Sequence, residues 1–570
     1  MIKPFAPAYI GTRMGRPEKA ERRIMKGSPN LLFPVGRDDA GEKKQRSLIK
    51  AAQHKTVRVE LGKRFCPECK EFTFLANCPT CGTLTEQRRV CVRCGQVTKL
   101  DMHCEIPTKR SDNYFLPFKE LIDAAAGNVG ERVPAELKGV VGMSSRSKIP
   151  ERIEKGILRA KHRVLVNKDG TIRFDGTDSP ISHFTPIEIG TSVSRLRELG
   201  YVEDIHGKPL EQDDQVVELL AQDILVSDFR DPDGKIASGA DYCTQICNFV
   251  DDLLERFYGM PRFYNISCRE DLVGHLVITL APHTSAAIIG RIIGFTPARV
   301  YYTHPLLIAA RRRNADGDED SISLALDALL NFSRSFLPDT QGARTMDAPL
   351  VLTLILNPSE IDDEVWDMDT SWDYSPAFYE MTYDYPDPKD AKKAHNVEQY
   401  ADRIGKNAQY EGLGFNIGTT DVSAGPTITA YKFLGSMIEK VDAQLELAHK
   451  LRAVNADGVA GLVLGTHFLS DIKGNIRTFT RQKIRCITCN SKYRRIPLTG
   501  VCTRCGGKLI LTVAPGSVSK YIMPSMRIAE NFKITSYLNQ QLEVATRRLL
   551  SMFGKEKHQQ VGLDAFFQKK

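Results

Sequence analysis

Cysteine pairs constrain the folding of this chain more than any other feature. Ten of its 14 cysteines lie in Cys-x-x-Cys pairs, and two neighbouring pairs can place four thiolates around one zinc ion. Because four thiolates leave no open position for a substrate, such sites are structural. We therefore predict two zinc ribbons, formed by Cys66, Cys69, Cys78 and Cys81 and by Cys486, Cys489, Cys502 and Cys505.

A third pair is less complete. Cys91 and Cys94 are followed by Cys104, and no fourth cysteine is near. His103 could complete a metal site, but its adjacency to Cys104 argues against joint ligation, so a third zinc site is left open. The isolated cysteines are interpreted as small, buried apolar residues: Cys243, Cys247 and Cys268.

Charge is distributed unevenly, although the net charge is only +8. Residues 1–50 hold 12 Lys/Arg against 5 Asp/Glu, residues 471–570 hold 19 against 5, and residues 359–390 hold 11 acids and one lysine. The basic ends predict nucleic-acid contacts at two places, with ordinary solvated surfaces as the alternative. We find neither an apolar run of membrane-spanning length nor a secretory signal, and expect a cytoplasmic protein.

Hydrophobic patterning predicts several local elements. A hairpin is expected to turn at Asp169 and Gly170, and an apolar helical stripe is expected from Ile322 to Phe332. Cys243 and Cys247 are four residues apart on one expected helix. The other expected elements are strands at 272–283 and 347–356, and helices within 15–27, 111–127, 243–258, 286–295 and 440–454.

A dense charged run, RRRNADGDED, occupies residues 311–320. Its carboxylates at every second position repel one another unless a cation lies between them, and side chains two apart in an extended loop can share that cation. Asn314 adds a neutral oxygen ligand or an orienting amide. The arginines either hold the loop or contact phosphate that a ligand brings to the metal. The run predicts metal-assisted phosphoryl or nucleotidyl transfer, with three candidate ligands: Asp316, Asp318 and Asp320.

The main rival interpretation is a calcium-binding loop. The three aspartates match its first, third and fifth positions, and Asp327 falls at the twelfth. However, Ser321 stands where that loop requires glycine, and glutamate is usual at the twelfth position. The helical stripe also begins too early, at Ile322. A merely solvated acidic loop is the remaining alternative.

Seven segments carry a more specific signal: RRRNADGDEDS, APHTSAAIIGRIIGF, LDALLNFSR, MDAPLV, KPFAPAYIGTRMGRPEKAERR, KGILRAKH and FTRQKIRCITCNSKYRR. With the zinc ribbons, they resemble the C-terminal half of the large catalytic subunit of archaeal family-D DNA polymerases (DNA polymerase II). The resemblance implies a multidomain α+β chain. Its catalytic core would contain RNA polymerase-like double-psi β-barrels, with zinc ribbons and a helical C-terminal region.

The resemblance also implies roles for individual residues. Asp316 and Asp318 match the family's pair of ligands for two Mg²⁺ ions, and Asp320 is a further candidate. A second barrel would supply basic residues, here from Arg13, Arg16 and Lys19, with Lys19 the first choice. The segment GRPEKA also suits an ordinary helix start. His283 and His304 flank the run, and both are interpreted as structural histidines.

The function implied is replicative DNA-directed DNA synthesis by nucleotidyl transfer to a primer 3′-hydroxyl. Family members act with a small proofreading subunit that carries 3′–5′ exonuclease activity. Two alternatives stay open: an RNA polymerase-like nucleotidyltransferase, and a non-catalytic scaffold for DNA and clamp. The tail, residues 555–570, fits the motif that binds the sliding clamp PCNA as a short 3₁₀ turn, through Gln560, Leu563, Phe566 and Phe567.

Family chains extend well upstream of the segment that begins here at Met1. We therefore expect the upstream half to be a separate chain, an intein-separated piece or the missing part of a truncated gene. The resemblance divides the sequence into seven parts: 1–62, the end of the first barrel; 63–106, zinc-ribbon modules; 107–235, a mixed α/β insert; 236–480, the second barrel region; 481–512, the C-terminal zinc ribbon; 513–554, a helical tail; and 555–570, the clamp-binding peptide.

Overall fold

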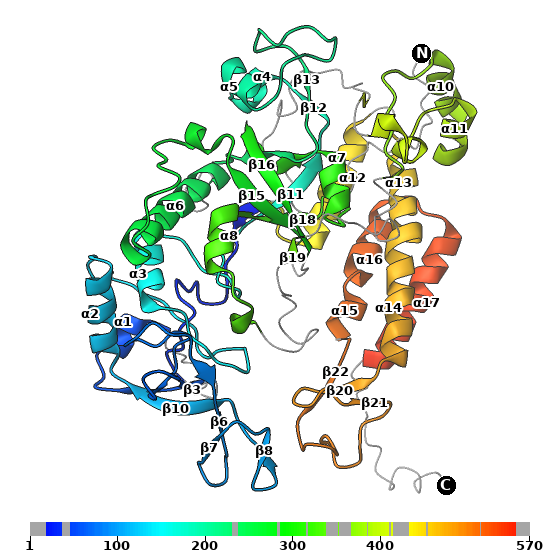
Figure 1. The fold of residues 1–570 in the computed structure, drawn as a ribbon. Helices are drawn as coiled ribbons and strands as arrows, with labels where there is room; N and C mark the ends of the chain where they lie inside the picture. Colours follow the sequence, from blue (N-terminus) through cyan, green and yellow to red (C-terminus); the bar gives the residue numbers. More distant parts are fainter. Residues whose placement is uncertain are drawn as a thin grey trace, which may run out of the picture. The chain divides into compact units, whose positions relative to one another are not determined.

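The chain divides into two compact units, one of Gly15–Thr429 and one of Met1–Met14 with Ala430–Lys570. Figure 1 shows the elements of both units. Among the described residues, no helix is long and apolar enough to cross a membrane. The computed structural model describes residues 19–36, 46–230, 238–281, 286–314, 317–337, 351–352, 366–384, 386–409, 412–413, 433–451, 454–513 and 515–553.

A closed six-stranded barrel forms the centre of the larger unit. Its strands pair in the ring β11–β17–β14–β16–β15–β18, and β18 pairs back onto β11. The ring is mixed: the β11–β17 and β14–β16 pairs are parallel and the other four are antiparallel. The strand bounds are β11 Phe174–Pro180, β14 Asp223–Ser227, β15 Leu276–Leu280, β16 Ala286–Thr296, β17 Tyr301–Thr303 and β18 Glu319–Leu324.

Two short strands extend the barrel sheet. β1 (Ala20–Arg22) pairs antiparallel with β11, and β19 (Val351–Leu352) pairs parallel with β16. Residues 174–176 of β11 therefore have β1 on one edge and β18 on the other. β1, from the N-terminal segment, and β18, which follows the acidic run, are therefore separated by β11 alone.

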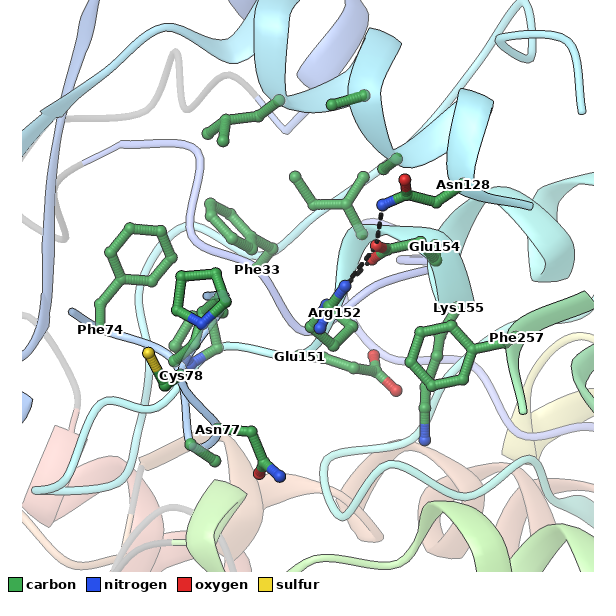
Figure 2. A pocket seen from close by; sticks show the side chains of 18 of the residues that line it. Phe33, Phe74, Asn77, Cys78, Asn128, Glu151, Arg152, Glu154, Lys155 and Phe257 are labelled. Carbon is green, nitrogen blue, oxygen red and sulfur yellow. Dashed lines mark hydrogen bonds and ion pairs between the residues drawn. The ribbon is translucent and has the colours of Figure 1, made fainter. Parts of the chain in front are cut away.

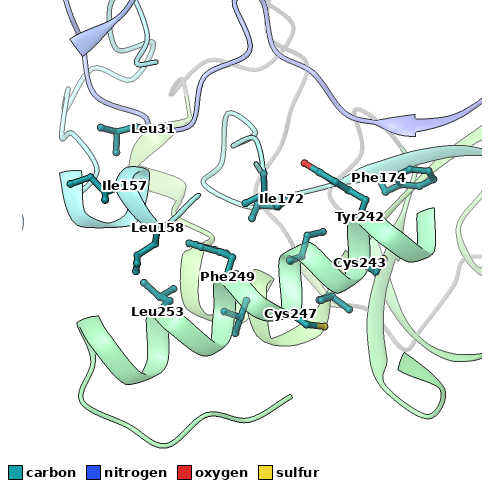
Figure 3. Close-up of a cluster of buried hydrophobic side chains, with 14 of the residues drawn as sticks. Leu31, Ile157, Leu158, Ile172, Phe174, Tyr242, Cys243, Cys247, Phe249 and Leu253 are labelled. Carbon is teal, nitrogen blue, oxygen red and sulfur yellow. The ribbon is translucent and has the colours of Figure 1, made fainter. Parts of the chain in front are cut away.

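A helical layer packs against the barrel in the larger unit. Ser238 accepts a hydrogen bond from the Asp241 amide and so caps α6 (Gly239–Asp252). Figure 3 shows Tyr242 of α6 beside Phe174 and Phe249 of α6 beside Leu158, and all four side chains belong to one buried cluster. The surrounding helices are α1 Leu48–Ala51, α2 Phe118–Asn128, α3 Ile153–Lys161, the π-helix η1 Leu253–Phe257, η2 Arg269–Leu272, α7 Pro305–Ala310, α8 Ala325–Asn331 and η3 Arg334–Phe336.

Smaller substructures complete the larger unit. β2 (Val57–Gly62) and β10 (Ser111–Leu116) pair antiparallel, and two cysteine-rich modules lie between them in the sequence. Their strands are β3 Arg64–Phe65, β4 Phe72–Thr73, β5 Glu86–Gln87, β6 Arg89–Val90, β7 Val97–Thr98, β8 Met102–His103 and β9 Ile106–Pro107. The other elements are β12 His183–Phe184, α4 Pro186–Ile189, α5 Val193–Glu198, β13 Val217–Glu218, α10 Pro376–Met381, η5 Thr382–Asp384, α11 Pro388–Ala394, η6 Tyr400–Arg403 and η7 Asn407–Gln409.

The smaller unit is helical with a cysteine-rich ribbon. α13 (Ala456–Leu462), η9 (Val463–Phe468) and α14 (Leu469–Arg481) follow one another without a break, and the ribbon strands pair in the order β21–β20–β22. Phe468, Ile472 and Leu542 belong to its apolar core. The remaining elements are α12 Met437–Lys450, β20 Ile484–Cys486, β21 Lys492–Tyr493, β22 Leu509–Leu511, α15 Pro515–Ser519, α16 Ile522–Asn531 and α17 Ser536–Phe553.

The helix predicted at 286–295 is wrong, because this segment is the barrel strand β16. β16 pairs with three strands, and a strand enclosed in this way carries a continuous apolar run that periodicity cannot tell from a buried helix. Its glycines permit close packing: a Cβ on Gly294 would lie 2.7 Å from Ile189 Cβ. Isoleucine-rich β-branched composition was the better indicator.

Three other local predictions need correction. Residues 20–22 form strand β1 rather than a helix, because Ala20 pairs with β11. Ile322 lies in β18, so the helical stripe begins only at Ala325. The 111–127 segment splits at Pro117 into β10 and α2, since proline cannot supply an amide to the strand ladder.

Several predictions are confirmed. The strand at 272–283 is β15, and the helices at 243–258 and 440–454 are α6 with η1 and α12. The turn at Asp169–Gly170 exists, with Gly170 at φ 93°, but only its second arm becomes a strand, β11. Of the strand predicted at 347–356, the described part is β19.

Candidate active site

The acidic run forms a turn between α7 and β18. α7 ends at Ala310, Arg312 and Gly317 have positive φ angles of 59° and 99°, and β18 begins at Glu319. A left-handed conformation at Gly317 is accessible to glycine at little cost, which explains the residue at this point. Asp316 lies outside the described residues, as does Ala315.

Asp318 lies at the end of this turn, where the barrel strand begins. Its side-chain Oδ2 is 3.5 Å from Arg313 Nη1, and the Asn314 amide lies 3.4 Å from the same oxygen. The Asp318 carbonyl accepts a hydrogen bond of 3.0 Å from the Asp178 amide on β11. Backbone pairing to the barrel therefore fixes the position of this carboxylate.

Asp320 lies on β18 and has no exposed surface. Its Oδ2 lies 2.8 Å from Arg311 Nη1, and the same guanidinium binds the carboxylate of Asp178 through Nη2. Burial raises the pKa of Asp178 to about 7; Arg311 opposes this shift and the Asp320 charge adds to it. Arg311 is therefore an internal ion-pair partner, and its burial excludes the phosphate contact predicted for it.

Lys19 lies beside the start of β18. Its Nζ is 3.1 Å from Glu319 Oε2 and 3.5 Å from Asp175 Oδ2. Burial alone would lower the pKa of Lys19, but Asp175, Glu319 and Glu21 outweigh it and raise the pKa. The ammonium therefore stays charged. The other two predicted basic residues, Arg13 and Arg16, lie outside the described residues.

Sequence reasoning missed three polar residues around this turn. Asp175 and Asp178 come from β11, and Arg23 donates a 3.2 Å hydrogen bond to Ser321 Oγ of β18. Their sequence separations from the run are about 140 and 300 residues, so no local spacing links them to it. The only sequence signal for Asp175 and Asp178 was weak: they are two acids in RFDGTDSP, a segment that follows a predicted turn and was expected to enter the core.

His304 has the structural role predicted for it. Its Nδ1 accepts a 3.0 Å hydrogen bond from the Leu306 amide and so caps α7. Burial lowers the pKa of His304 to about 4, and the neighbouring His183 adds to the shift. His304 is therefore neutral at physiological pH. His283 lies outside the described residues.

The first and last cysteine sets each converge on one point. In each set, four sulfur atoms lie within 4.8 Å of one another. The Cys66–Cys81 and Cys486–Cys505 sulfur pairs are both 3.5 Å apart. Four convergent thiols form a donor set that fits a structural zinc ion.

In the middle set, His103 supplies the fourth donor atom that sequence reasoning had left open. His103 Nδ1 lies 3.4 Å from Cys94 Sγ and 3.1 Å from Cys104 Sγ, and it belongs to the same four-donor group as Cys91. Cys104 and Glu105 have φ angles of 51° and 64°, and this tight turn aims two consecutive side chains at one point. Adjacency is thus compatible with joint ligation.

The isolated cysteines divide into two kinds. Cys243 and Cys247 are buried in α6, as predicted, and burial raises the pKa of both thiols. Cys268 is exposed, so the prediction that it is buried is wrong. It stands in an exposed turn directly before η2 and not in the apolar face of a helix.

A cavity of about 700 Å³ lies between the first cysteine module, α2 and α3 (Figure 2). Its carboxylates are held by protein partners: Glu154 binds Arg152 and Asn128, and Glu151 binds Arg159. No residue of the run 311–320 lines it. The cavity is therefore separate from the acidic turn. The predicted clamp-binding residues Gln560, Leu563, Phe566 and Phe567 lie outside the described residues.

Comparisons with known proteins place these features in a family. The family model described as "DNA polymerase II large subunit DP2, catalytic domain" matches residues 130–440, and the model of its central domain matches residues 1–100. Curated DNA polymerase II large subunits from Methanothermobacter thermautotrophicus, Archaeoglobus fulgidus and Pyrococcus furiosus are 48%, 46% and 47% identical to the chain.

These alignments cover 99%, 99% and 96% of this chain, but 48%, 49% and 43% of the respective relatives. The chain thus spans about half the length of the curated relatives that it matches. The acidic turn and the complete barrel ring fall within the match to the catalytic-domain model.

Proposed function

This chain belongs to the DNA polymerase II large subunit family, and we propose that it carries the nucleotidyl-transfer centre of a replicative DNA-directed DNA polymerase. The acidic turn is the observation that carries the proposal. Asp318 lies inside the region that matches the catalytic-domain model and is fixed by backbone pairing to the barrel, and the cationic Lys19 contacts the residue that follows it, Glu319.

We assign Asp316 and Asp318 as ligands of two catalytic Mg²⁺ ions, since carboxylate oxygen is the donor that Mg²⁺ prefers. Ions held by these two carboxylates would lower the pKa of the primer 3′-hydroxyl and offset phosphate charge. Asn314 orients the turn. Lys19, together with Arg13 and Arg16, offsets the charge of the triphosphate and of the departing pyrophosphate.

The finer architecture belongs to the same proposal. The six-stranded ring is one of two double-psi β-barrels, and residues 1–62 end the other. Pairing of β1 with β11 supports this assignment, because it brings Lys19 from the N-terminal segment to the acidic turn. The three cysteine-rich groups hold structural zinc ions and stiffen ribbons that are too small to fold around an apolar core alone.

We further propose that the chain works in the cytoplasm with primer-template DNA, deoxynucleotides and other polypeptides. These are a small subunit with 3′–5′ exonuclease activity, the upstream half of the large subunit, and the sliding clamp bound by the tail. The family relationship supports these partners. In the described residues we find no second carboxylate and histidine group that would serve as a nuclease centre.

Nucleotide choice tests the proposal. The chain is co-expressed with the small subunit and the upstream half, and primer extension is measured with Mg²⁺ and either deoxy- or ribonucleotides. We expect Mg²⁺-dependent extension with deoxynucleotides. Preferential incorporation of ribonucleotides would instead indicate an RNA polymerase-like enzyme, and a complex without any synthesis would indicate a scaffold.

A further inference from the structure

Three charged side chains form a buried cluster at the barrel strands β11 and β18 that the proposed chemistry does not use. Asp320 is 0% exposed, and Arg311 and Asp178 are each 1% exposed. Arg311 Nη1 lies 2.8 Å from Asp320 Oδ2, and Nη2 binds the Asp178 carboxylate. We name this group, Arg311 with Asp178 and Asp320, the arginine clasp.

The clasp joins the three segments that meet at the acidic turn. Arg311 follows α7, Asp178 lies on β11 and Asp320 lies on β18. Thr303 of β17 adds a fourth connection, because its hydroxyl donates to Asp178 Oδ1 over 2.8 Å and accepts from Arg311 Nη2 over 2.9 Å. The turn is therefore fastened at both of its ends.

The clasp is in direct contact with the proposed metal ligand. The Asp178 amide donates to the Asp318 carbonyl over 3.0 Å, so the residue held by Arg311 also pairs with the Asp318 backbone. On the other side, the Tyr301 hydroxyl donates to the Asp320 carbonyl over 2.6 Å. A displacement of either clasp aspartate would move Asp318.

Each oxygen of Asp320 faces an arginine, although neither oxygen accepts a hydrogen bond within the described part of the chain. Arg311 lies at one carboxylate oxygen, and Arg313 Nε lies 3.5 Å from the other. A metal ion on Asp320 would have to displace Arg311 and leave a guanidinium buried beside one carboxylate, and breaking a buried ion pair in this way is strongly unfavourable.

We propose that Arg311 is a positioning residue that holds the carboxyl groups of Asp178 and Asp320, and that Asp320 is not a metal ligand. This proposal deepens the proposed function and rests on it, since Asp318 is taken as a ligand. Asp320 continues the spacing of the other two aspartates, but its role is to anchor the turn. Asp178 on β11 has the same anchoring role as Asp320 on β18.

Binding of Mn²⁺, followed by electron paramagnetic resonance on the zinc-loaded chain, tests the proposal. We expect Asp318→Asn to weaken Mn²⁺ binding by about 10-fold or more. Asp320→Asn and its matched control Asp178→Asn should each weaken Mn²⁺ binding much less than Asp318→Asn does, and to about the same extent as each other. Asp320→Asn that weakens binding as strongly as Asp318→Asn, with Asp178→Asn at wild-type affinity, would overturn the proposal.

Thermal unfolding provides the second readout. Asp178→Asn and Asp320→Asn should both lower the unfolding temperature by several degrees, on the order of 5–10 °C. Arg311→Met combined with both substitutions should recover much of this loss, because it removes all three buried charges together. A stable Asp320→Asn variant beside an unstable Asp178→Asn variant would contradict the clasp.

The triple variant keeps the proposal testable if the single variants fail to fold. It should bind Mn²⁺ less tightly than the wild type, because Asp318 is no longer positioned, but more tightly than Asp318→Asn, because the ligand is still present; Mn²⁺ binding as weak as that of Asp318→Asn would overturn the assignment of Asp320. Unchanged binding by Asp318→Asn would contradict the proposed metal site instead, and the clasp would then be judged by the unfolding temperatures.

Discussion

Arg311 and Asp320 show how burial changes the meaning of a charged residue. Their sequence context suggested a phosphate contact and a metal ligand, yet Arg311 reaches inward and pairs with both Asp320 and Asp178. The partner that decides these roles, Asp178, is 133 residues away from Arg311 in the chain. Short-range spacing therefore predicted which cysteines converge on one point and could not predict the clasp.

The pH dependence of stability should reflect His304. Its pKa is about 4 in the folded chain, below the ordinary value near 6.5. The unfolded chain therefore binds a proton that the folded chain excludes, and stability falls as the pH drops from about 6.5 towards 4. The loss should reach about 2–3 kcal/mol.

The substitution His304→Asn isolates this contribution. Asparagine can keep the helix cap but cannot titrate, so urea unfolding between pH 4 and 7 should be less pH-dependent in the variant. An unchanged pH profile would contradict the assignment of the effect to His304.

Lys19 should affect nucleotide use rather than folding. Its ammonium lies beside Glu319 and Asp175 at the start of β18. We expect Lys19→Ala to lower kcat/KM for deoxynucleotide incorporation by about 10-fold, with Lys119→Ala as an exposed control. Equal kcat/KM values for the two variants in the assembled complex would remove Lys19 from the site.

Strand β16 illustrates why an element's type was mispredicted. Its apolar run is continuous because β14, β15 and β19 all pair with it, so the run lacks the alternation of a half-exposed strand. Strand β15 is also a largely apolar run, buried from Val277 to Leu280, and it was predicted correctly. The closure of β18 onto β11 depends on residues about 145 positions apart, which no local pattern encodes.

The surroundings of Gly294 in β16 and Gly474 in α14 predict opposite effects when each glycine is replaced by alanine. Gly294→Ala places a Cβ 2.7 Å from Ile189 Cβ and should destabilise the larger unit by about 1–3 kcal/mol. Gly474→Ala in α14 meets nothing within 4 Å and should stabilise its helix by up to about 1 kcal/mol. Denaturant unfolding measures both, and a stable Gly294→Ala variant would contradict the close approach.

The middle cysteine module predicts a further zinc ion. Purified chain should lose one equivalent of zinc upon His103→Ala, because the imidazole is one of four convergent donors. His54→Ala, a histidine outside the three donor sets, is the control. Elemental analysis after gel filtration measures the content, and equal zinc in both variants would exclude His103 as a ligand.

The whole chain combines well-predicted and unpredictable parts. Cysteine spacing and the rare acidic run indicated the ribbons and the chemistry, because both signals lie within short segments. The barrel ring is assembled from strands spread over residues 174–324, so it was reached through family resemblance and not through local patterns. The division into units at Ala430 also differs from the boundary expected near residue 480, since α12, α13 and α14 share one core.

The tail should bind the sliding clamp as a short peptide. We expect Phe566→Ala with Phe567→Ala to abolish clamp binding by the assembled complex, because the two rings supply most of the apolar contact. Gln560→Ala should weaken binding and the neighbouring Gln559→Ala should not. Surface plasmon resonance with immobilised clamp measures this, and full binding by the double variant would place the contact elsewhere in the complex.

The most direct test of the acidic turn is the rate of single-nucleotide incorporation by the reconstituted complex as a function of Mg²⁺ concentration. Asp318→Asn should lower the maximal rate on the order of 100-fold or more, because a metal ligand at the reacting phosphate is lost. Asp214→Asn, an exposed aspartate outside the turn, should retain the wild-type rate. Wild-type incorporation by Asp318→Asn would contradict the assignment of the acidic turn as the catalytic centre.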